Sequence, residues 1–476
     1  MKLNDVLNNV EIINTSNMSD VDVSGVCYNS KNIKCADVFV AVKGFSTDGH
    51  KYIKNACENG ACAVVAEHFT DGIDVPQIIV KDSRIAQAQI SANFFGNPAK
   101  KLKLIGITGT NGKTTCTYLI KHILECAGKS VGLIGTNQNM IGEKIIETGR
   151  TTPDSYELQS LFSQMVKEGV EYVVMEISSH ALELNRVYGC EFEVGAFTNL
   201  TQDHLDFHGT MDNYAKAKEK LFSISKTAVI NTDDKYGLNM ALNCNPEYTY
   251  GIYSNCNTKA ENVSLMQNGV KFCVNSKEIF LPIPGKFSVY NCLCAYCVSK
   301  AVGICEDDIV NYLSNAHGVK GRAEIVKTNR DFTVMIDYAH TPDGIENILK
   351  TVKGFAKGRV VILFGCGGDR DNTKRPVMGK IAASLSDFCI VTSDNPRSED
   401  PKKIIDMVVE GVKEENTPYV VIENRKDAIE YAIINAKKDD VIVLAGKGHE
   451  TYQILNDKTI HFDEREIVAD VLDKLN

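Results

Sequence analysis

The stretch that decides the fold is Leu102-Lys-Leu-Ile-Gly-Ile-Thr108, which continues directly into Gly109-Thr-Asn-Gly-Lys-Thr-Thr115. The first part is a short apolar run, which predicts a buried β-strand. The second part is a glycine-rich loop that precedes a helical pattern over residues 116–127. Glycines let backbone N–H groups curl around phosphate oxygens, and the N-terminus of the following helix adds a favourable field. The sequence therefore predicts a strand–loop–helix unit that binds the phosphates of a nucleotide.

Within this loop, Lys113 is expected to reach the outer phosphates and Thr114 to ligate Mg²⁺. The strict six-residue spacing of such loops is missed, because Ile107 stands where the first glycine is expected and Gly109 lies nearer the lysine. We therefore expect a variant phosphate loop; the alternative is a glycine turn that arose by chance. The loop residues expected to bind ATP are Gly109, Thr110, Asn111, Gly112, Lys113, Thr114 and Thr115.

Three further stretches of the same segment carry candidate residues. The apolar run Tyr172-Val-Val-Met-Glu176 ends in a carboxylate, which predicts that Glu176 binds Mg²⁺. The run Thr198–Gly209 is dense in possible ligands, and His204 and His208 would share a face if the run is helical. Lys218 lies in a lysine-rich amphipathic stretch, whose pattern alone indicates a solvated helix surface.

The last third of the chain shows the clearest alternation of strands and helices, which is typical of parallel α/β domains. Its apolar runs are Phe332–Ile336, Val360–Phe364, Phe388–Val391, Tyr419–Ile422 and Val441–Leu444. Polar or glycine-rich clusters follow these runs, namely Asp337–His340, Gly365–Arg370, Ser393–Arg397, Glu423–Arg425 and Ala445–Glu450. Because ligands bind outside the carboxyl ends of parallel strands, we expect these clusters to meet at one edge of a Rossmann-like sheet. After them, Ser398-Glu-Asp-Pro401 is typical of a helix start.

Two turn-rich stretches divide the 476 residues, a length that suits about three domains. They are Gly96-Asn97-Pro98 and the glycine-punctuated run from Asn315 to Arg322. The sequence predicts an α/β protein with a smaller N-terminal α/β domain (1–98), a central P-loop parallel-sheet ATPase domain (99–322) and a C-terminal Rossmann-like domain (323–476).

Composition excludes several classes of protein. The net charge of −9 argues against a nucleic-acid-binding surface. The N-terminus does not resemble a signal peptide, and no apolar run approaches the roughly 20 residues of a membrane span. Sixteen cysteines without export signals indicate reduced thiols in the cytoplasm. The spacing Cys292-x-Cys294-x-x-Cys297 could hold a metal, but its apolar helical pattern favours buried core.

Seven motifs, in this order, make the chain resemble the Mur ligase family over nearly its whole length. They are Thr108–Thr115, Met175–His180, Asp203–Asp206, Asp337–Asp343, Gly365–Arg370, Asp394–Arg397 and Gly446–Glu450. The resemblance implies an ATP-dependent amide-bond ligase with Mg²⁺, acting in cytoplasmic peptidoglycan precursor synthesis. The three domains would bind the UDP moiety of UDP-N-acetylmuramoyl-L-alanyl-D-glutamate, ATP and the incoming amino acid, in chain order. We expect a monomer without nucleic-acid partners.

The resemblance also assigns residues. Lys113, Glu176, His204 and Lys218 match catalytic positions; Thr114, Glu176 and His204 match metal ligands; and Lys218 matches a lysine that CO₂ carbamylates in the family. Further nucleotide contacts would come from Asn291, Arg322, Asp337 and His340. Contacts to the muramoyl dipeptide substrate would come from Ser30, Thr151, Thr152, Ser178 and Arg186.

The added amino acid is expected to be meso-diaminopimelate, which carries a second carboxylate where L-lysine has none. A guanidinium grips a carboxylate with two parallel hydrogen bonds, so Arg397 is the expected reader of that group. Alternatively, Arg397 pairs with Glu399 or Asp400 at the helix start. The residues that match the family's diaminopimelate pocket are Arg370, Asp394, Asn395, Pro396, Arg397, Gly446 and Glu450.

One departure from the family stands in the N-terminal domain, where Asn29-Ser30-Lys31 replaces the usual Asp-Ser-Arg. Three alternatives remain open. The ligase could use L-lysine, the chain could be a folylpolyglutamate-synthase-like ligase, or the P-loop could serve a switch module that hydrolyses ATP without forming a bond. The convergent polar clusters of the last domain favour a ligase over a switch.

Overall fold

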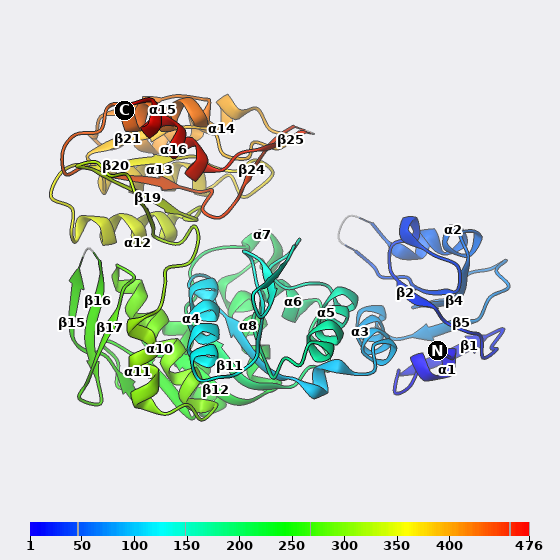
Figure 1. Ribbon diagram of the computed structural model, residues 1–476. Helices are drawn as coiled ribbons and strands as arrows, with labels where there is room; N and C mark the ends of the chain where they lie inside the picture. The colour runs from blue at the N-terminus through cyan, green and yellow to red at the C-terminus, as the bar shows by residue number, and fades with distance from the viewer. Residues whose placement is uncertain (45–46, 148, 267, 457, 476) are drawn as a thin grey trace. The chain divides into compact units, whose positions relative to one another are not determined.

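In the computed structural model, β6 (Lys103–Thr108) runs through the glycine-rich loop into helix α4 (Lys113–Cys126). Figure 1 labels this helix. Every residue of β6 after Lys103 is buried. The helix begins three residues before the predicted start, because its polar first turn is invisible to a search for apolar periodicity. The predicted strand–loop–helix unit is confirmed.

The structure describes residues 1–44, 47–147, 149–266, 268–456 and 458–475. Two compact units divide the chain. The first comprises Met1–Gly109, Leu124–Ala196 and Tyr214–Ala228, and the second comprises Thr110–Ile123, Phe197–Asn213 and Val229–Asn476. Within the described ranges, none of the helices has both the length and the apolar character needed to span a bilayer.

The first unit opens with an N-terminal sheet in the order β1-β5-β4-β3-β2. Its strands are β1 (Ile12–Ser16), β2 (Gly25–Cys27), β3 (Asp37–Val40), β4 (Ala61–Ala66) and β5 (Gln77–Val80), and its helices are α1 (Leu3–Val6), α2 (Ile53–Glu58) and α3 (Ser83–Phe94). Both faces of the sheet are covered, since Val38 and Val40 join one apolar cluster and Phe39 joins another. After α3, Gly96 and Asn97 take left-handed conformations, which confirms the predicted turn.

Around β6, the first unit has the strand order β11-β6-β10-β7-β8-β9. The elements here are β7 (Val131–Ile134), β8 (Asn139–Ile141), β9 (Lys144–Ile146), α5 (Ser155–Lys167), β10 (Tyr172–Glu176), α6 (Ser179–Glu183), β11 (Phe192–Phe197) and α8 (Met211–Ser223). β10 runs parallel to both β6 and β7, so Glu176 lies at the carboxyl end of a buried strand as predicted. The antiparallel β7-β8-β9 meander was not predicted.

The second unit contains the rest of the central segment. Its elements are α7 (Leu205–His208), the last part of β12 (Ser225–Asn231), α9 (Lys235–Cys244), β13 (Tyr248–Gly251), β14 (Thr258–Lys259), α10 (Lys286–Ala301) and α11 (Glu306–Ser314). An antiparallel meander of β15 (Glu261–Met266), β16 (Gly269–Val274) and β17 (Lys277–Leu281) precedes α10. Cys292, Cys294 and Cys297 are completely buried in α10, and burial raises the pKa of the Cys297 thiol to about 12. Their interpretation as core side chains is confirmed.

The C-terminal sheet has the order β18-β19-β23-β20-β21-β22. Its strands are β18 (Glu324–Val326), β19 (Thr333–Asp337), β20 (Val360–Phe364), β21 (Phe388–Val391), β22 (Tyr419–Val421) and β23 (Val441–Ala445). All of them except β18 run parallel to their neighbours, so the five predicted strands are confirmed. Their carboxyl ends share one edge of the sheet.

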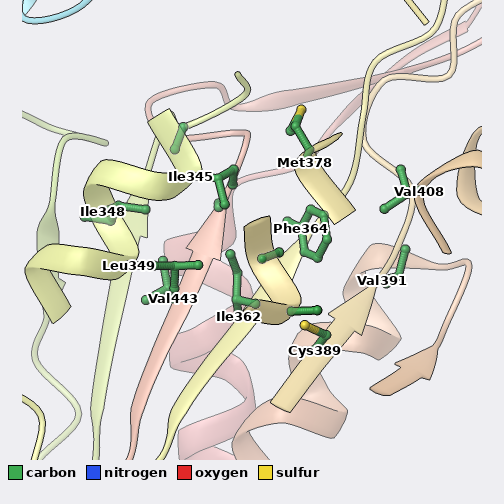
Figure 2. Close-up of a cluster of buried hydrophobic side chains, with 14 of the residues drawn as sticks. Ile345, Ile348, Leu349, Ile362, Phe364, Met378, Cys389, Val391, Val408 and Val443 are labelled. Carbon is green, nitrogen blue, oxygen red and sulfur yellow. The ribbon is translucent and has the colours of Figure 1, made fainter. Parts of the chain in front are cut away.

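Helices cover both faces of this sheet. Ile362 and Phe364 of β20 pack against α12 (Pro342–Lys353), α13 (Lys374–Ser384) and α14 (Pro401–Val412), as Figure 2 shows around Phe364. Val361 and Leu363 point the other way and pack with α15 (Arg425–Ile434) and α16 (Glu464–Lys474). A short hairpin of β24 (Tyr452–Leu455) and β25 (Lys458–His461) follows β23. Because the central strands β20, β21 and β23 bury both faces, apolar residues run continuously along them.

Helix α14 begins as the sequence predicts and packs very closely on α13. Asp400 accepts a hydrogen bond from the Lys402 amide, and Pro401 occupies the first helical position. Further along, Gly411 lies so near α13 that an added Cβ would come within 1.8 Å of the Pro376 carbonyl oxygen. Gly379 makes the reciprocal approach, with 2.1 Å to the Val408 oxygen.

The close packing of α13 on α14 predicts that replacing Gly411 by alanine lowers the stability of the protein, although alanine favours helix formation. In an open helix, Gly→Ala stabilises by about 1 kcal/mol. Here we expect Gly411→Ala to destabilise by roughly 1–3 kcal/mol, because the two helix backbones would have to separate. Denaturant unfolding measures the change. Gly318→Ala is the control, since open space surrounds Gly318 and little change is expected; equal stability of both variants would contradict the prediction.

Candidate functional site

A cavity of about 320 Å³ lies in the second unit, between the phosphate loop, α10 and the carboxyl end of β19. Seven of the predicted nucleotide-binding residues line it, namely Asn111, Gly112, Thr115, Asn291, Arg322, Asp337 and His340. Thr114 adjoins this group, because its Oγ1 accepts a hydrogen bond from Arg322 at 3.2 Å. The fold therefore gathers residues separated by more than two hundred positions around one polar hollow.

The phosphate loop is held in a conformation that only glycine takes without strain. Gly112 has a φ of +86°, and a Cβ there would lie 2.4 Å from Oδ1 of Asn291. Lys113 turns its ammonium back onto the loop and donates to the Thr110 carbonyl at 2.9 Å. This arrangement places a cation beside the backbone N–H groups at the start of α4, where anions bind well.

Side chains outside the loop fix its position. The amides of Thr110 and Asn111 donate to the carbonyl and side-chain oxygens of Asn199 at 2.8 and 2.9 Å. Nδ2 of Asn111 donates to Asp343 at 2.6 Å, which ties the loop to the first turn of α12. Both tethers lie within the second unit. Asp343 belongs to the motif that the sequence singled out, but its contact with the loop was not predicted.

Two groups at the end of β19 have shifted pKa values. Burial raises the pKa of the Asp337 carboxyl, against the guanidinium of Arg322 and the amides of Ala323 and Ala339. Desolvation by the surrounding groups and the Lys374 ammonium lower the pKa of the His340 imidazole, although part of this side chain stays exposed. The Arg322 guanidinium lies 4.7 Å from the centre of the Tyr338 ring. Asp337 and Arg322 thus form a rigid polar wall of the cavity.

Asp233 is a further cavity residue, and the sequence did not reveal it. Its carboxylate accepts hydrogen bonds from the amides of Ile252, Tyr253 and Ser254 and from the Tyr290 hydroxyl. Burial alone would raise its pKa, but these donors lower it to about 2. The only sequence signal was an acidic pair after an apolar run, and such pairs are common at strand ends.

In the first unit, Glu176 lies among the residues predicted to contact the muramoyl dipeptide. Its carboxylate accepts from the amide and hydroxyl of Thr136 at 2.9 and 3.0 Å, and Thr136 also bonds Thr151. Thr152 binds the Glu176 carbonyl and accepts from the Ser178 amide. The Thr152 carbonyl accepts a hydrogen bond from the Arg186 guanidinium. The end of β10 therefore brings together Thr151, Thr152, Ser178 and Arg186.

Lys218 is buried, with 1% of its surface exposed, so the interpretation of this helix surface as solvated is wrong at this residue. Its ammonium donates to the Gly109 carbonyl at 2.8 Å and lies 4.5 Å from the centre of the Tyr214 ring. The neighbouring Lys216 and Lys220 are exposed, so the general pattern was right and only one of its members points inward.

His204 and His208 do not share a helical face. α7 begins at Leu205, and His204 precedes it with a left-handed φ of +53°. His204 stays half-exposed beside Asp203, whereas His208 is buried. Burial would raise the pKa of Asp203, but the neighbouring His204 imidazole and the Lys374 ammonium lower it. Of the three predicted metal ligands, Thr114 and His204 belong to the second unit and Glu176 to the first.

Ser30 lies in a short 3₁₀ turn of the N-terminal sheet region and is buried. Asn29 caps this turn by accepting from the Lys31 amide at 3.1 Å. An aspartate would make the same cap through its carboxylate. The departure from the family pattern at position 29 therefore keeps the local backbone conformation.

The last cluster gathers at the carboxyl ends of β21 and β23. Nδ2 of Asn395 donates to Glu450 at 3.0 Å, and Lys447 bonds both residues, at 2.6 and 3.2 Å. Gly446 has a φ of +117°, and a Cβ there would meet Asp394 at 2.6 Å. Burial raises the pKa of the Glu450 carboxyl, against the ammonium of Lys447. Four of the residues predicted for the amino-acid pocket, Asp394, Asn395, Gly446 and Glu450, thus lie together.

Arg397 adjoins this cluster in a left-handed conformation, with a φ of +52°. Its guanidinium donates to the Gly368 carbonyl at 2.7 Å. Glu399 instead receives two hydrogen bonds from the buried Arg375, and the Asp400 carboxylate caps α14. The alternative in which Arg397 pairs with Glu399 or Asp400 is therefore not what the structure shows. Arg370 lies on the exposed loop after β20 and Pro396 is buried.

Comparison with known proteins agrees with this arrangement. Residues 22–99 match the model described as Mur ligase family, catalytic domain; residues 107–299 match the Mur ligase middle domain; and residues 321–448 match the Mur ligase, glutamate ligase domain. A 2,6-diaminopimelate ligase acting on UDP-N-acetylmuramoyl-L-alanyl-D-glutamate, from Caldanaerobacter subterraneus subsp. tengcongensis, is 54% identical over 99% of both chains. A ligase of the same name from Clostridium acetobutylicum is 50% identical over the full length of both.

A solved structure of a UDP-N-acetylmuramoyl-L-alanyl-D-glutamate–2,6-diaminopimelate ligase superimposes with a TM-score of 0.70 at 30% identity, covering 100% of this chain and 99% of that one. The α/β fold, the three matched family domains and these relatives together define a three-domain α/β enzyme of the ATP-dependent ligase class, as the sequence predicted. The chain belongs to the Mur ligase family.

Proposed function

We propose that this ligase adds meso-diaminopimelate to UDP-N-acetylmuramoyl-L-alanyl-D-glutamate, with ATP converted to ADP and phosphate, in the synthesis of peptidoglycan precursors. One observation supports diaminopimelate as the added amino acid. Arg397, Asn395 and Glu450 lie in one cluster, and the Arg397 guanidinium donates a hydrogen bond to a neutral carbonyl rather than to a carboxylate. A carboxylate and an ammonium at the far end of diaminopimelate would meet Arg397 and Glu450 respectively. L-Lysine would offer only the ammonium.

The reaction requires activation of a carboxylate that otherwise resists attack by an amine. Transfer of the γ-phosphoryl group of ATP to the D-glutamate side chain gives an acyl phosphate and ADP. The amine then attacks the acyl carbon, and collapse of the tetrahedral intermediate expels phosphate as the amide bond forms. Lys113 and the amides of the phosphate loop would bind the phosphates and spread their developing charge. Asn291, Arg322 and Asp337 would orient the nucleotide.

The residues present suit Mg²⁺, which the reaction is expected to need. Within the second unit, Thr114 has a hydroxyl oxygen. Within the first unit, the Glu176 carboxylate uses only part of its acceptor capacity on Thr136. His204 adds a half-exposed imidazole. Oxygen ligands are those that Mg²⁺ prefers, and the bound ion would neutralise charge on the phosphate oxygens.

We further propose that the enzyme works in the cytoplasm as a monomer. Its domains would be 1–98 for the UDP substrate, 99–322 for ATP and 323–476 for the amino acid. Ser30, Thr151, Thr152, Ser178 and Arg186 would contact the muramoyl dipeptide. The grouping of the last four around Glu176 supports this assignment, because the phosphoryl acceptor must lie near the metal.

ADP release tests the proposed function directly. We expect purified protein with ATP, Mg²⁺ and UDP-N-acetylmuramoyl-L-alanyl-D-glutamate to turn over when meso-diaminopimelate is added, and to be nearly inactive with L-lysine. Turnover with lysine instead would keep the ligase but reject the specificity. ADP release that needs neither acceptor nor amine would indicate a switch module, and release with a folate acceptor would indicate a folylpolyglutamate synthase.

Arg397→Ala tests the proposed reader of the far carboxylate. We expect kcat/KM for diaminopimelate to fall roughly 100-fold, since losing one partner of a desolvated charge pair typically costs 2–5 kcal/mol. The KM for ATP should stay near its parent value. Lys402→Ala is the matched control, because Lys402 is an exposed cation in the neighbouring turn of α14. Parent-like activity of Arg397→Ala at subsaturating diaminopimelate would reject this role.

Lys218 is the proposed site of carbamylation. The Lys218 ammonium would first lose one proton, and the neutral amine would then attack CO₂, forming an N–C bond and releasing a second proton, so that a buried cation becomes an anion beside the phosphate loop. We expect intact-protein mass spectrometry under CO₂ to show one added CO₂ that Lys218→Ala lacks, and activity that falls on CO₂ removal. Lys216→Ala is the control on the exposed surface of the same helix. Full activity of Lys218→Ala would contradict the proposal.

A further inference from the structure

Lys447 is a completely buried cation that the proposed reaction does not yet use. It follows Gly446 in the loop after β23, and none of its side chain is exposed. Its ammonium donates to three oxygens: Oδ1 of Asn395 at 2.6 Å, the Tyr452 carbonyl at 2.9 Å and Oε2 of Glu450 at 3.2 Å. A lysine ammonium has three N–H donors, so each of them has an acceptor here.

These contacts set the orientation of the Asn395 amide. Its Oδ1 accepts from both Lys447 and the Ile454 amide, so its Nδ2 must face the other way. That nitrogen donates to Glu450, which Lys447 also contacts. The buried ammonium therefore fixes two predicted amino-acid-binding side chains relative to one another.

The third contact reaches Arg397 through the β24–β25 hairpin. Tyr452 is the first residue of β24, and the end of that strand pairs with Arg397. The Arg397 carbonyl accepts from the Asn456 amide at 2.9 Å, and its own amide points at the Ile454 carbonyl. A non-glycine residue in the left-handed region is unfavourable, so contacts of this kind are needed to hold it there.

Lys447 also sets the charge of the cluster. Asp394 lies 3.9 Å from its ammonium, so the two carboxylates of Asp394 and Glu450 are matched by the two cations Lys447 and Arg397. An electrically balanced pocket suits a ligand end that carries one ammonium and one carboxylate. A pocket without Lys447 would be net negative and would favour a lone ammonium.

We propose that Lys447 is a positioning residue that determines amino-acid specificity. It fixes Asn395, Glu450 and the strand that holds Arg397, and it balances the pocket for a zwitterionic ligand end over the single ammonium of L-lysine. This inference rests on the proposed function.

Lys447→Met tests it, because methionine keeps much of the volume and removes the charge and the donors. Steady-state rates with meso-diaminopimelate and L-lysine, and the KM for ATP, are measured for parent and variant. We expect the KM for diaminopimelate to rise roughly 30-fold or more and the preference for diaminopimelate over lysine to fall at least about 10-fold. The KM for ATP should change less than about twofold. Lys380→Met, which removes an exposed cation from α13, should match the parent.

The outcomes separate this inference from the proposed function. A parent inactive with both amino acids rejects the proposed function and the inference with it. If the parent is active and Lys447→Met keeps the parent's preference for diaminopimelate over lysine, the inference alone is rejected. A variant whose kcat falls equally with both amino acids also rejects the inference alone. If Lys447→Met does not fold at the assay temperature, Lys447→Gln replaces it, because an amide removes the charge but keeps a hydrogen-bond donor. It should raise the KM for diaminopimelate and lower the preference for diaminopimelate over lysine without moving the KM for ATP, and an unchanged preference would reject the inference.

Discussion

The parallel alignment of β19, β23, β20 and β21 is the constraint on which the C-terminal site depends. In this register Asp337 pairs with Ala445 and Phe364 with Val391, so four loops leave the sheet side by side. Loops so close together need small residues where they meet. A Cβ on Gly368 would lie 1.9 Å from the Pro396 carbonyl oxygen, and one on Gly365 would lie 2.3 Å from that of Thr392. The polar residues of these loops become neighbours because the parallel strands all end at the same edge of the sheet.

Buried cations then hold the loops in one arrangement. Arg425 pairs with Glu464 at 2.8 Å, with both side chains fully buried, and it also donates to the Ala445 carbonyl just before the Gly446 loop. Arg375, which is buried, holds the partly exposed Glu399 after β21. Ion pairs of this kind contribute little net stability, because each buried charge loses its hydration. Their effect is to give each loop one conformation, which a site that discriminates between two similar amino acids requires.

The sequence was sufficient wherever a short range of residues carries the signal. The five parallel strands of the C-terminal sheet, the phosphate loop and the capped start of α14 at Asp400 depend on local pattern and were predicted, whereas the antiparallel edge strand β18 was not. The β7-β8-β9 meander and the β24–β25 hairpin were not, since short strands with mixed burial lack a clear period. Lys218 and Lys447 show the harder limit. Each is one lysine among many, and burial by distant segments gives it a partner that no spacing reveals.

Arg397 shows why contacts rather than composition decide between two interpretations of one motif. Two acids follow it in the sequence, and either could have neutralised it. The structure assigns Glu399 to Arg375 and Asp400 to the first turn of α14, so both acids are used elsewhere. Arg397 itself donates to a neutral carbonyl, which leaves its full charge and several N–H donors for a ligand. A left-handed backbone costs about 1–2 kcal/mol for such a residue. The pairing of β24 with Arg397 holds the residue in that unfavourable conformation. The β24–β25 hairpin, which no sequence pattern predicted, therefore orients the backbone from which the guanidinium extends.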